Sequence, residues 1–253
     1  MKIGLVYCGY NIKEYVTETI TPWVEAKEFF EIKIAAVALP FKEYLGSGQG
    51  EDGTVEILSN LLAENKIDFL YTEPKYIQEH IARNLCLFAV LAHNPDIVIM
   101  VDGDEFYTVD SIKRIVEYIE KTPEVDCYEI DFKNYVFDGK QWIDGFHPFR
   151  IFKNNKHGGI NQFYWDNDII FNNRTTHKQS NFITIPREVA HIKHMTWLND
   201  ERSRLKMEYQ TKKTGGCSYV WNSETKSLSF DYAYYDKYGY ERPNLFRDED
   251  SIG

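Results

Sequence analysis

Short apolar segments alternate with longer amphipathic segments over the first half of the chain. The apolar segments are rich in Val, Ile and Ala, which is typical of buried strands, and they cover residues 2–7, 31–39, 69–71 and 97–101. Apolar residues recur at helical spacing over residues 12–30, 54–65, 74–92 and 110–121. This alternation predicts an α/β fold, a three-layer α/β/α domain with parallel strands and right-handed crossovers.

Proline and aspartate indicate where the helices should bend or begin. Pro22 should bend or split the first helix, because a proline ring clashes with the preceding turn. Pro74 should begin the third helix, because the first turn of a helix tolerates proline. Asp110 should cap the fourth helix, because its carboxylate can accept hydrogen bonds from the first N–H groups. Residues 46–53 are glycine-rich and are expected to form a plain loop, because no Lys-Ser or Lys-Thr follows as in a P-loop.

The pattern changes after residue 124. Residues 126–137 and 142–152 alternate between polar and apolar side chains, which predicts antiparallel strands joined by a turn. Residues 188–195 predict a further strand, and residues 199–214 predict a basic amphipathic helix that ends at the two following glycines. The second half is therefore expected to contain mixed strands.

These patterns predict one domain with a short extension. The domain would cover residues 1–217, divided into a parallel half of residues 1–123 and a mixed-strand half of residues 124–217. Residues 218–253 are rich in Tyr and Phe, and they are too short to fold alone. We expect this extension to pack on the domain, because tyrosine suits a half-buried surface.

Composition narrows the class of protein. The chain has 253 residues and 43% hydrophobic residues, and no apolar run approaches the roughly 20 residues that span a bilayer. Its formal net charge of −10 argues against sequence-independent binding to nucleic acid or anionic lipid, since both need a basic surface. The 4 cysteines lie far apart without a Cys-x-x-Cys pair, which is typical of reduced thiols in a cytosolic protein. A cytoplasmic location is therefore expected.

Acidic residues follow the most apolar of the predicted strands. Asp102 and Asp104 come directly after it, with Gly103 between them and Glu105 next. Ligands of parallel sheets bind at the carboxyl ends of the strands, and residues two apart in extended backbone point to the same side. Two carboxylates this close repel each other unless a cation lies against them, and oxygen ligands suit Mg²⁺ or Mn²⁺, which bind diphosphates. The alternative is a strand end with a solvated acidic turn.

Five short segments occur in the same order as in a known family. They are Val6-Tyr7-Cys8-Gly9-Tyr10-Asn11 with Glu14, Ala82-Arg83-Asn84, Asp102-Gly103-Asp104-Glu105, Phe149-Arg150-Ile151-Phe152-Lys153, and His194 followed by Lys206 and Tyr209. The set resembles GT-A glycosyltransferases of family 2, in the branch similar to lipopolysaccharide-core glucosyltransferases. In that branch the segments are the opening strand with its Asn-Glu turn, Ala-Arg-Asn, Asp-Ala-Asp-Glu, Arg-Leu-Phe-Arg, and the late His, Lys and Tyr. The resemblance covers residues 2–210.

The resemblance implies a hexosyltransferase that takes a nucleoside-diphosphate sugar, with a UDP-sugar as the first expectation, and a glycan or another hydroxyl acceptor. The residues that it implies for binding the donor are Tyr7, Gly9, Asn11, Arg83, Asp102, Gly103 and Lys206. Asp102, Asp104 and His194 would bind Mn²⁺ or Mg²⁺ as the cofactor. His191 lies on the opposite face of the predicted strand from His194, so only one of them can face the site. The alternatives are a satisfied core histidine at position 194 and an ordinary helix-surface charge at Lys206.

The general base is the least defined part of the predicted site. If the reaction inverts the anomeric configuration, a carboxylate must accept the proton of the acceptor hydroxyl. Asp166 and Asp168 are the candidates, because they follow a strand edge in the second half; either can also be an ordinary loop residue. The His-Glu pair that such relatives carry after the Arg-Leu-Phe segment has no clean counterpart here, so the base and the acceptor stay open.

Two other classes of function fit parts of the sequence. A metal-dependent nucleotidyltransferase on a similar fold would release pyrophosphate instead of a nucleoside diphosphate. A carbohydrate-binding protein without catalytic activity would use the aromatic extension, and removal of metal would leave its binding unchanged.

Overall fold

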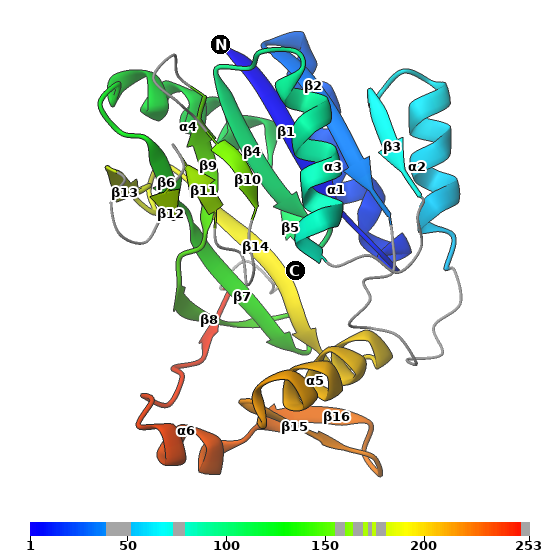
Figure 1. Ribbon diagram of the computed structural model, residues 1–253. Helices are drawn as coiled ribbons and strands as arrows, with labels where there is room; N and C mark the ends of the chain where they lie inside the picture. The colour runs from blue at the N-terminus through cyan, green and yellow to red at the C-terminus, as the bar shows by residue number, and fades with distance from the viewer. Residues whose placement is uncertain are drawn as a thin grey trace. The chain divides into compact units, whose positions relative to one another are not determined.

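The computed structural model describes residues 1–38, 52–72, 79–154, 160–163, 169–171, 174–175 and 181–248 (Figure 1). The chain forms two compact units. Unit 1 consists of Met1–Asp131 and His147–Ile192, and unit 2 consists of Phe132–Phe146 and Lys193–Gly253. The division predicted after residues 123 and 217 stays a prediction.

Unit 1 is built on one sheet with the strand order β13-β6-β9-β4-β1-β2-β3. Its strands are β1 (Lys2–Cys8), β2 (Glu31–Val37), β3 (Phe69–Tyr71), β4 (Ile97–Asp102), β6 (Cys127–Glu129), β9 (Phe149–Lys153) and β13 (Phe182–Thr184). Strands β1 to β4 run parallel to one another, as the alternation of elements predicted. Strand β9 is antiparallel to both β4 and β6, and β13 is parallel to β6. The sheet is therefore parallel on one side of β4 and mixed on the other.

Helices cover both faces of this sheet and complete the three layers. They are α1 (Lys13–Glu25), the 3-10 helix η1 (Ala26–Glu28), α2 (Thr54–Ala63), α3 (Glu79–Leu91) and α4 (Val109–Lys121). Helix α3 lies in front of the sheet in Figure 1, and its Val90 packs in one apolar cluster with Val6 and Cys8 of β1. Helix α1 covers the other face, where Thr19 hydrogen-bonds Tyr7 of β1. Because successive residues of β1 point to opposite faces, both faces of the strand are buried.

The expected effect of Pro22 is tested only in part, and the expected cap of the fourth helix was wrong. Pro22 lies inside α1 and does not split it, and the other expectation, a bend of the helix, stays a prediction. Helix α4 is capped by Thr108 instead of Asp110, which lies in the first turn. The hydroxyl of Thr108 accepts a hydrogen bond from the Ser111 N–H at 3.0 Å, and the Thr108 N–H donates to the Ser111 hydroxyl at 2.9 Å. The expected start of α3 at Pro74 and most of the glycine-rich loop lie outside the described residues.

The two long strands expected after residue 124 are each divided in two. The first becomes β6 and β7 (Asp131–Phe137), and the second becomes β8 (Gln141–Phe146) and β9. Strand β6 pairs with β9 in the sheet of unit 1, whereas β7 pairs with β8 in a different sheet. Pro148 lies between β8 and β9, and proline has no N–H group to donate to a strand ladder. Alternation predicted the strand character but not the change of sheet. A small separate sheet in unit 1 contains β10 (Ile160–Phe163), β11 (Ile169–Phe171) and β12 (Arg174–Thr175).

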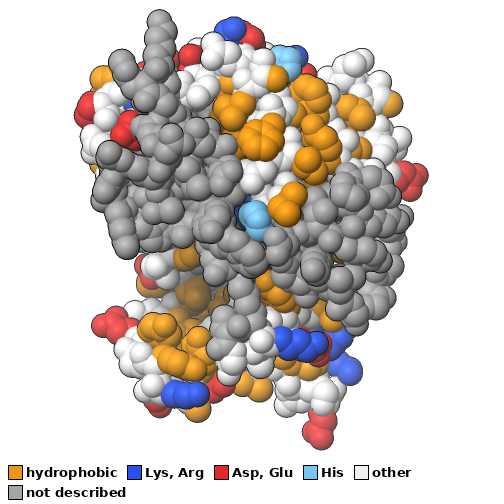
Figure 2. Space-filling model, viewed as in Figure 1, with side chains coloured by type: hydrophobic (Ala, Val, Ile, Leu, Met, Phe, Trp, Pro, Cys, Tyr) orange, Lys and Arg blue, Asp and Glu red, His pale blue; other side chains and the backbone are white. Residues whose placement is uncertain are grey.

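Unit 2 combines β7 and β8 with the C-terminal part of the chain. Its other elements are β14 (His191–Leu198), α5 (Glu201–Thr214), β15 (Tyr219–Asn222), β16 (Ser227–Phe230), α6 (Tyr232–Tyr238) and β17 (Phe246–Arg247). Trp197 of β14 stacks on Tyr219 of β15 with ring centroids 4.3 Å apart, in a cluster that also contains Val136 of β7. The aromatic tail therefore shares a core with β7 and β14. Tyrosines of α6 remain exposed, and Figure 2 shows hydrophobic side chains on the surface over this helix.

The remaining expectations concern membranes and cysteines. Within the described ranges, no helix is long and apolar enough to cross a bilayer. All four cysteines are buried, and none forms a disulfide, as the spacing predicted. Strand β14 begins later and runs further than the predicted 188–195. Helix α5 ends at Thr214, and Gly215 caps it with a φ of +76°, as predicted.

Candidate functional site

Asp102 ends β4 beside the end of β1. Strands β4 and β1 are neighbours in the sheet, and Asp102 lies in register with Cys8. From β1 the chain proceeds to β2 and β3 on one side, and it returns to β4 on the other side. Such a reversal of strand order leaves a crevice at the carboxyl ends of the two strands, which is where open α/β sheets bind ligands. The acidic residues therefore lie at the binding position of this fold.

A tight turn follows Asp102. Gly103 and Asp104 form this turn, and β5 (Glu105–Phe106) comes next. The expected extended backbone from Asp102 to Asp104 was therefore wrong. The Gly103 N–H donates to the carbonyl oxygen of Cys8 at 2.7 Å, which continues the hydrogen bonding between β1 and β4 into the first residue of the turn.

Two of the predicted site glycines leave room for Ile12. A Cβ atom placed on Gly103 would lie 2.1 Å from Ile12 Cδ1, and one placed on Gly9 would lie 2.5 Å from the same atom. Ile12 is itself buried, and its backbone N–H donates to the Thr54 hydroxyl at 3.0 Å. The start of α2 thus holds the loop between β1 and α1. Sequence reasoning missed Thr54, which offered no motif.

Tyr7 and Asn11 belong to the same loop region. The Tyr7 side chain is fully buried, its hydroxyl lies 2.8 Å from that of Thr19, and burial raises its pKa. It therefore supports the turn at Gly103 from inside the core. Asn11 adopts a left-handed conformation with φ of 53°, which asparagine tolerates better than most residues. Their predicted contacts with the donor stay predictions.

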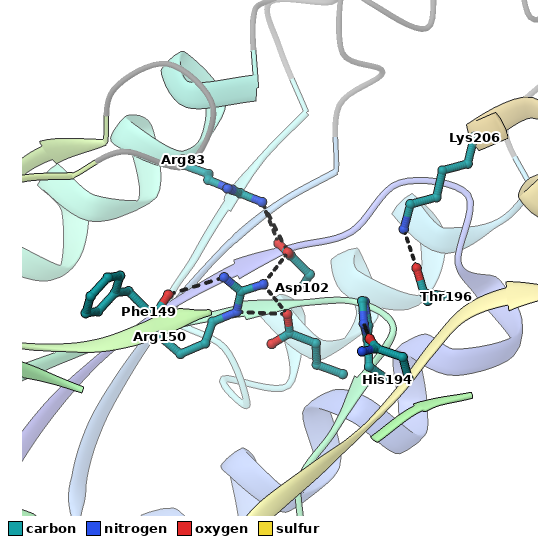
Figure 3. Close-up of polar contacts among 9 residues, drawn as sticks. Arg83, Asp102, Phe149, Arg150, His194, Thr196 and Lys206 are labelled. Atoms are coloured by element: carbon teal, nitrogen blue, oxygen red, sulfur yellow. Dashed lines mark hydrogen bonds and ion pairs between the residues drawn. The ribbon is translucent and has the colours of Figure 1, made fainter. Parts of the chain in front are cut away.

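Arg83 pairs with the first acid of the site. It lies on α3, it is buried, and its Nη2 donates to both carboxylate oxygens of Asp102 at 2.9 and 3.2 Å (Figure 3). The structure thus brings together two residues that the sequence placed in the site separately. Such a charge-assisted contact orients the carboxylate.

Arg150 is a second cation in the same place. Its Nη2 donates to Glu105 Oε1 at 2.6 Å and to Asp102 Oδ2 at 3.2 Å, and its Nε donates to Glu105 Oε1 at 2.9 Å (Figure 3). Burial raises the pKa of Glu105 to about 8, Arg150 opposes this shift, and the neighbouring Asp102 adds to it. The sequence had shown Arg150 only as part of the Arg-Leu-Phe-Arg-like segment, without a role. Its pairing partners lie about 50 residues away and depend on β9 running beside β4.

The acids fit a divalent cation that is shared with a diphosphate. Mg²⁺ commonly binds through one or two carboxylates and completes its shell with phosphate oxygens and water. Asp102 and Asp104 supply carboxylates of this kind, and the side chain of Asp102 is 23% exposed. Over the part of the chain that the structure describes, no group of three or more His, Cys, Asp or Glu side chains could hold a metal ion alone.

His194 lies on β14 in unit 2. It is buried, whereas His191 is exposed, so the two histidines face opposite ways as predicted. The Nδ1 atom of His194 lies 2.7 Å from the Asn134 side-chain oxygen on β7. The His194 ring, labelled in Figure 3, also contacts the ring of Phe132 edge-on. A ring that donates from Nδ1 to the Asn134 oxygen has its lone pair on Nε2, which is the arrangement that a metal-ligating histidine uses. Asn134 was missed by the sequence reasoning, and the metal contact of His194 stays a prediction.

Lys206 lies on α5 in unit 2. Its Nζ donates to the Thr196 hydroxyl at 2.6 Å (Figure 3). The same Nζ lies 5.3 Å from the centre of the Trp197 ring. These contacts hold the lysine against β14, so it is more than a free surface charge. Its predicted phosphate contact stays a prediction. The two candidate bases, Asp166 and Asp168, lie outside the described residues.

Comparisons with known proteins give one family. The model of the family described as Glycosyl transferase family 2 matches residues 46–184. One similar solved structure is the mannosyltransferase PcManGT from Pyrobaculum calidifontis in complex with GDP-Man and Mn²⁺. The match covers 85% of this chain and 64% of that chain, at 13% sequence identity and a TM-score of 0.51. No curated protein sequence matches.

TarS from S. aureus is also similar. Its structure of residues 1–349 matches at 18% identity and a TM-score of 0.40, over 53% of this chain and 36% of its own. The same part of TarS solved with UDP-GlcNAc matches at 14% identity and a TM-score of 0.43, over 89% of this chain and 69% of its own. The match to the first of these structures therefore spans only about a third of that relative's length.

Proposed function

Because the chain belongs to glycosyl transferase family 2, we propose that it transfers a sugar from a nucleoside-diphosphate sugar to a hydroxyl group of an acceptor glycan. The proposal includes a divalent cation, Mn²⁺ or Mg²⁺, and inversion at the sugar carbon that reacts. A UDP-sugar is the first donor to test.

The position of Asp102 is the observation that carries this proposal. The residue lies at the carboxyl end of β4, next to β1, where the strand order reverses. Nucleotides bind at this point of an open α/β sheet. The next acid, Asp104, lies in the turn that directly follows, and a second carboxylate this close to Asp102 supports a shared divalent cation.

The roles of the side chains follow from this placement. Asp102 and Asp104 would hold the cation, which supplies Lewis-acid stabilisation of the leaving diphosphate. Arg150 and Glu105 keep the Asp102 carboxylate in one orientation, because the guanidinium bridges both acids. Arg83 supplies a further positive charge beside the carboxylate. A site that positions charges in advance loses little energy to reorganisation during the reaction.

The acceptor side of the proposal rests on the sequence. An inverting transfer needs a carboxylate that accepts the proton of the acceptor hydroxyl as the new bond forms. Asp166 and Asp168 remain the candidates for this base. His194 is proposed as a further contact of the cation and Lys206 as a contact of phosphate, on the resemblance of the late segment.

The test begins with binding. Binding of UDP to the purified chain is measured by calorimetry with Mn²⁺, with Mg²⁺ and with EDTA, and we expect the affinity to fall strongly in EDTA. Asp104→Asn removes one ligand charge and should lower both binding and turnover by orders of magnitude. Asp110→Asn is the matched control, because Asp110 is an exposed acid in the first turn of α4.

The products then separate the classes of function. Incubation with a panel of nucleotide sugars should release a nucleoside diphosphate in the presence of an acceptor. A parallel incubation supplies a nucleoside triphosphate and a sugar 1-phosphate, and release of pyrophosphate there would instead identify a nucleotidyltransferase. Equal UDP binding in EDTA, or full turnover in Asp104→Asn, would contradict the assignment of the cation site.

A further inference from the structure

A second group of charged side chains lies at the same edge of the unit 1 sheet as Asp102. Strand β9 lies between β4 and β6 and is antiparallel to both, so the end of β6 and the start of β9 lie at the carboxyl end of β4 (Figure 1). Asp131 comes just after β6, and His147 comes just before β9. The Ile130 N–H donates to the carbonyl oxygen of Pro148 at 3.1 Å, which joins the two segments. Asp131 and His147 therefore lie at the edge where open α/β sheets bind ligands.

The side chains of this group surround one buried carboxylate. The Asp131 side chain is only 4% exposed, and Arg187 donates to both of its oxygens, from Nη2 to Oδ1 at 3.0 Å and from Nε to Oδ2. This pairing offsets the cost of burying a charge. The Nδ1 atom of His147 lies 3.3 Å from Asp131 Oδ1, and the His147 side chain is 40% exposed. A carboxylate that Arg187 holds in place thus faces an imidazole that a ligand can reach.

An imidazole beside a carboxylate is suited to accept a proton. A neutral ring that carries its proton on Nδ1, toward Asp131, keeps a lone pair on Nε2. When Nε2 accepts a proton, the ring becomes a cation, and the nearby carboxylate stabilises that form. The same two roles, an imidazole base and a carboxylate that orients it, recur in enzymes with unrelated folds.

The distance from Asp102 leaves room for a sugar. Strand β6 is the second strand from β4, and neighbouring strands lie about 4.8 Å apart, so Asp131 lies on the order of 10 Å from Asp102 across the sheet. Arg150 of β9, just beyond His147 in the chain, donates to Asp102 Oδ2 at 3.2 Å. A sugar whose diphosphate lies at Asp102 therefore fits between that residue and the imidazole of His147.

From this geometry, and resting on the proposed function, we propose that His147 is the general base of the transfer and that Asp131 positions it. The acceptor hydroxyl gives its proton to His147 Nε2 while its oxygen forms a bond to the reacting carbon of the sugar. The bond from that carbon to the diphosphate oxygen breaks, and its electron pair leaves with the nucleoside diphosphate. The imidazolium then releases the proton to water. This assignment places the base on His147 instead of Asp166 or Asp168.

The first test compares turnover with donor binding. Turnover is measured as UDP released from UDP-sugars, each supplied with a set of methyl glycosides as acceptors. His147→Ala should lower kcat by about 10²–10⁴-fold, the usual contribution of a general base, and should leave UDP affinity in Mn²⁺ unchanged. His93→Ala should keep wild-type turnover, and it is the matched control because His93 is an exposed histidine in the turn before β4, at the other end of that strand.

Added imidazole separates a catalytic role from a structural one. In His147→Ala, free imidazole can enter the space left by the side chain and accept the proton, so it should restore part of the lost turnover. Asp131→Asn should lower kcat because an amide no longer stabilises the cationic ring, whereas the KM for the UDP-sugar should stay near that of the wild type. Imidazole should not restore this variant, since its own ring is still in place. Circular dichroism verifies that each variant is folded.

Nuclear magnetic resonance locates the ring proton without any substrate. Long-range nitrogen–proton spectra in alkaline buffer, where imidazole rings are neutral, distinguish a proton on Nδ1 from one on Nε2. The signals of His147 are those that disappear in His147→Ala. We expect the proton on Nδ1 in the wild type and less of this form in Asp131→Asn, because an amide offers the ring its NH₂ group as well as its oxygen. If none of the methyl glycosides is an acceptor, this measurement alone decides.

Several results would overturn the role of His147. They are wild-type turnover in His147→Ala, a loss of turnover that imidazole does not restore, and a wild-type ring with its proton mainly on Nε2. Turnover that is lost in Asp166→Asn or Asp168→Asn but not in His147→Ala would return the base to a carboxylate. In each of these cases, UDP binding by the wild type would still support a nucleotide-sugar site. If the wild type binds no UDP under any condition, the proposed function itself fails.

Discussion

A methyl group at position 103 should destabilise the protein, because the turn after β4 leaves no space for it. The Cβ atom of Gly103→Ala would lie 2.1 Å from Ile12 Cδ1, 3.1 Å from Ile12 Cγ1 and 3.2 Å from the Tyr7 hydroxyl oxygen. Gly103 is not among the residues with positive φ, so alanine fits its backbone and the cost comes from the contacts alone.

The expected cost follows from two opposing terms. Overpacking of a buried site costs about 1–3 kcal/mol, and the lower entropy of the unfolded chain returns about 0.4–1 kcal/mol when glycine becomes alanine. The free energy of unfolding should therefore fall by about 1–2 kcal/mol. For a chain of this size, that corresponds to a decrease of about 2–8 °C in Tm. Urea unfolding followed by tryptophan fluorescence measures the change.

A double-mutant cycle identifies the contact. Ile12→Val removes Cδ1, the atom nearest to the new methyl group, and alone it should cost about 0.5–1.5 kcal/mol. The double variant Gly103→Ala/Ile12→Val should lose about 1 kcal/mol less unfolding free energy than the sum of the losses of the two single variants. Additive costs, or a Gly103→Ala variant as stable as the wild type, would refute the close approach of the two loops.

Three further predictions concern the buried cation pair, the late histidine and the tail. At pH 9, where Glu105 is ionised, Arg150→Met should lower the free energy of unfolding by about 3–5 kcal/mol, because it leaves the Glu105 carboxylate buried without its partner. The pKa of Glu105 is raised in the folded state, so the stability that its protonated form contributes is lost as pH rises through about 8. Arg150 holds this pKa down, so the loss should continue to higher pH in Arg150→Met. The difference in unfolding free energy between wild type and variant, measured in urea, should therefore be larger at pH 9 than at pH 6, and an equal difference at both values would contradict this. His194→Ala should raise the Mn²⁺ concentration needed for half-maximal activity whereas His191→Ala should not, and the reverse pattern would show that the strand faces the other way. Truncation after Gly216 should lower Tm or abolish transfer, because it removes Tyr219 from its stack on Trp197, and an equally stable and active shortened chain would mark the tail as independent.

The amino-acid sequence by itself determined the parallel half of the fold and the place of the acids within it. The Val- and Ile-rich run before Asp102 is typical of a strand buried on both faces, and the abrupt change to acidic residues marks its carboxyl end. Both signals are local, because burial and polarity are properties of consecutive residues. The opposite orientation of His191 and His194 followed in the same way from the two-residue period of a strand.

Only the tertiary structure decided which side chains meet at Asp102. Arg150 reaches Asp102 and Glu105 because β9 runs antiparallel beside β4, and no local pattern in the sequence specifies that pairing. The N–H of Gly103 likewise finds its acceptor, the carbonyl group of Cys8, on a neighbouring strand. Periodicity shows that a residue is buried, but the partner of a buried charge is set by contacts between segments far apart in the chain. For this reason the sequence indicated a pair of acids, whereas the structure shows an acid held by two arginines.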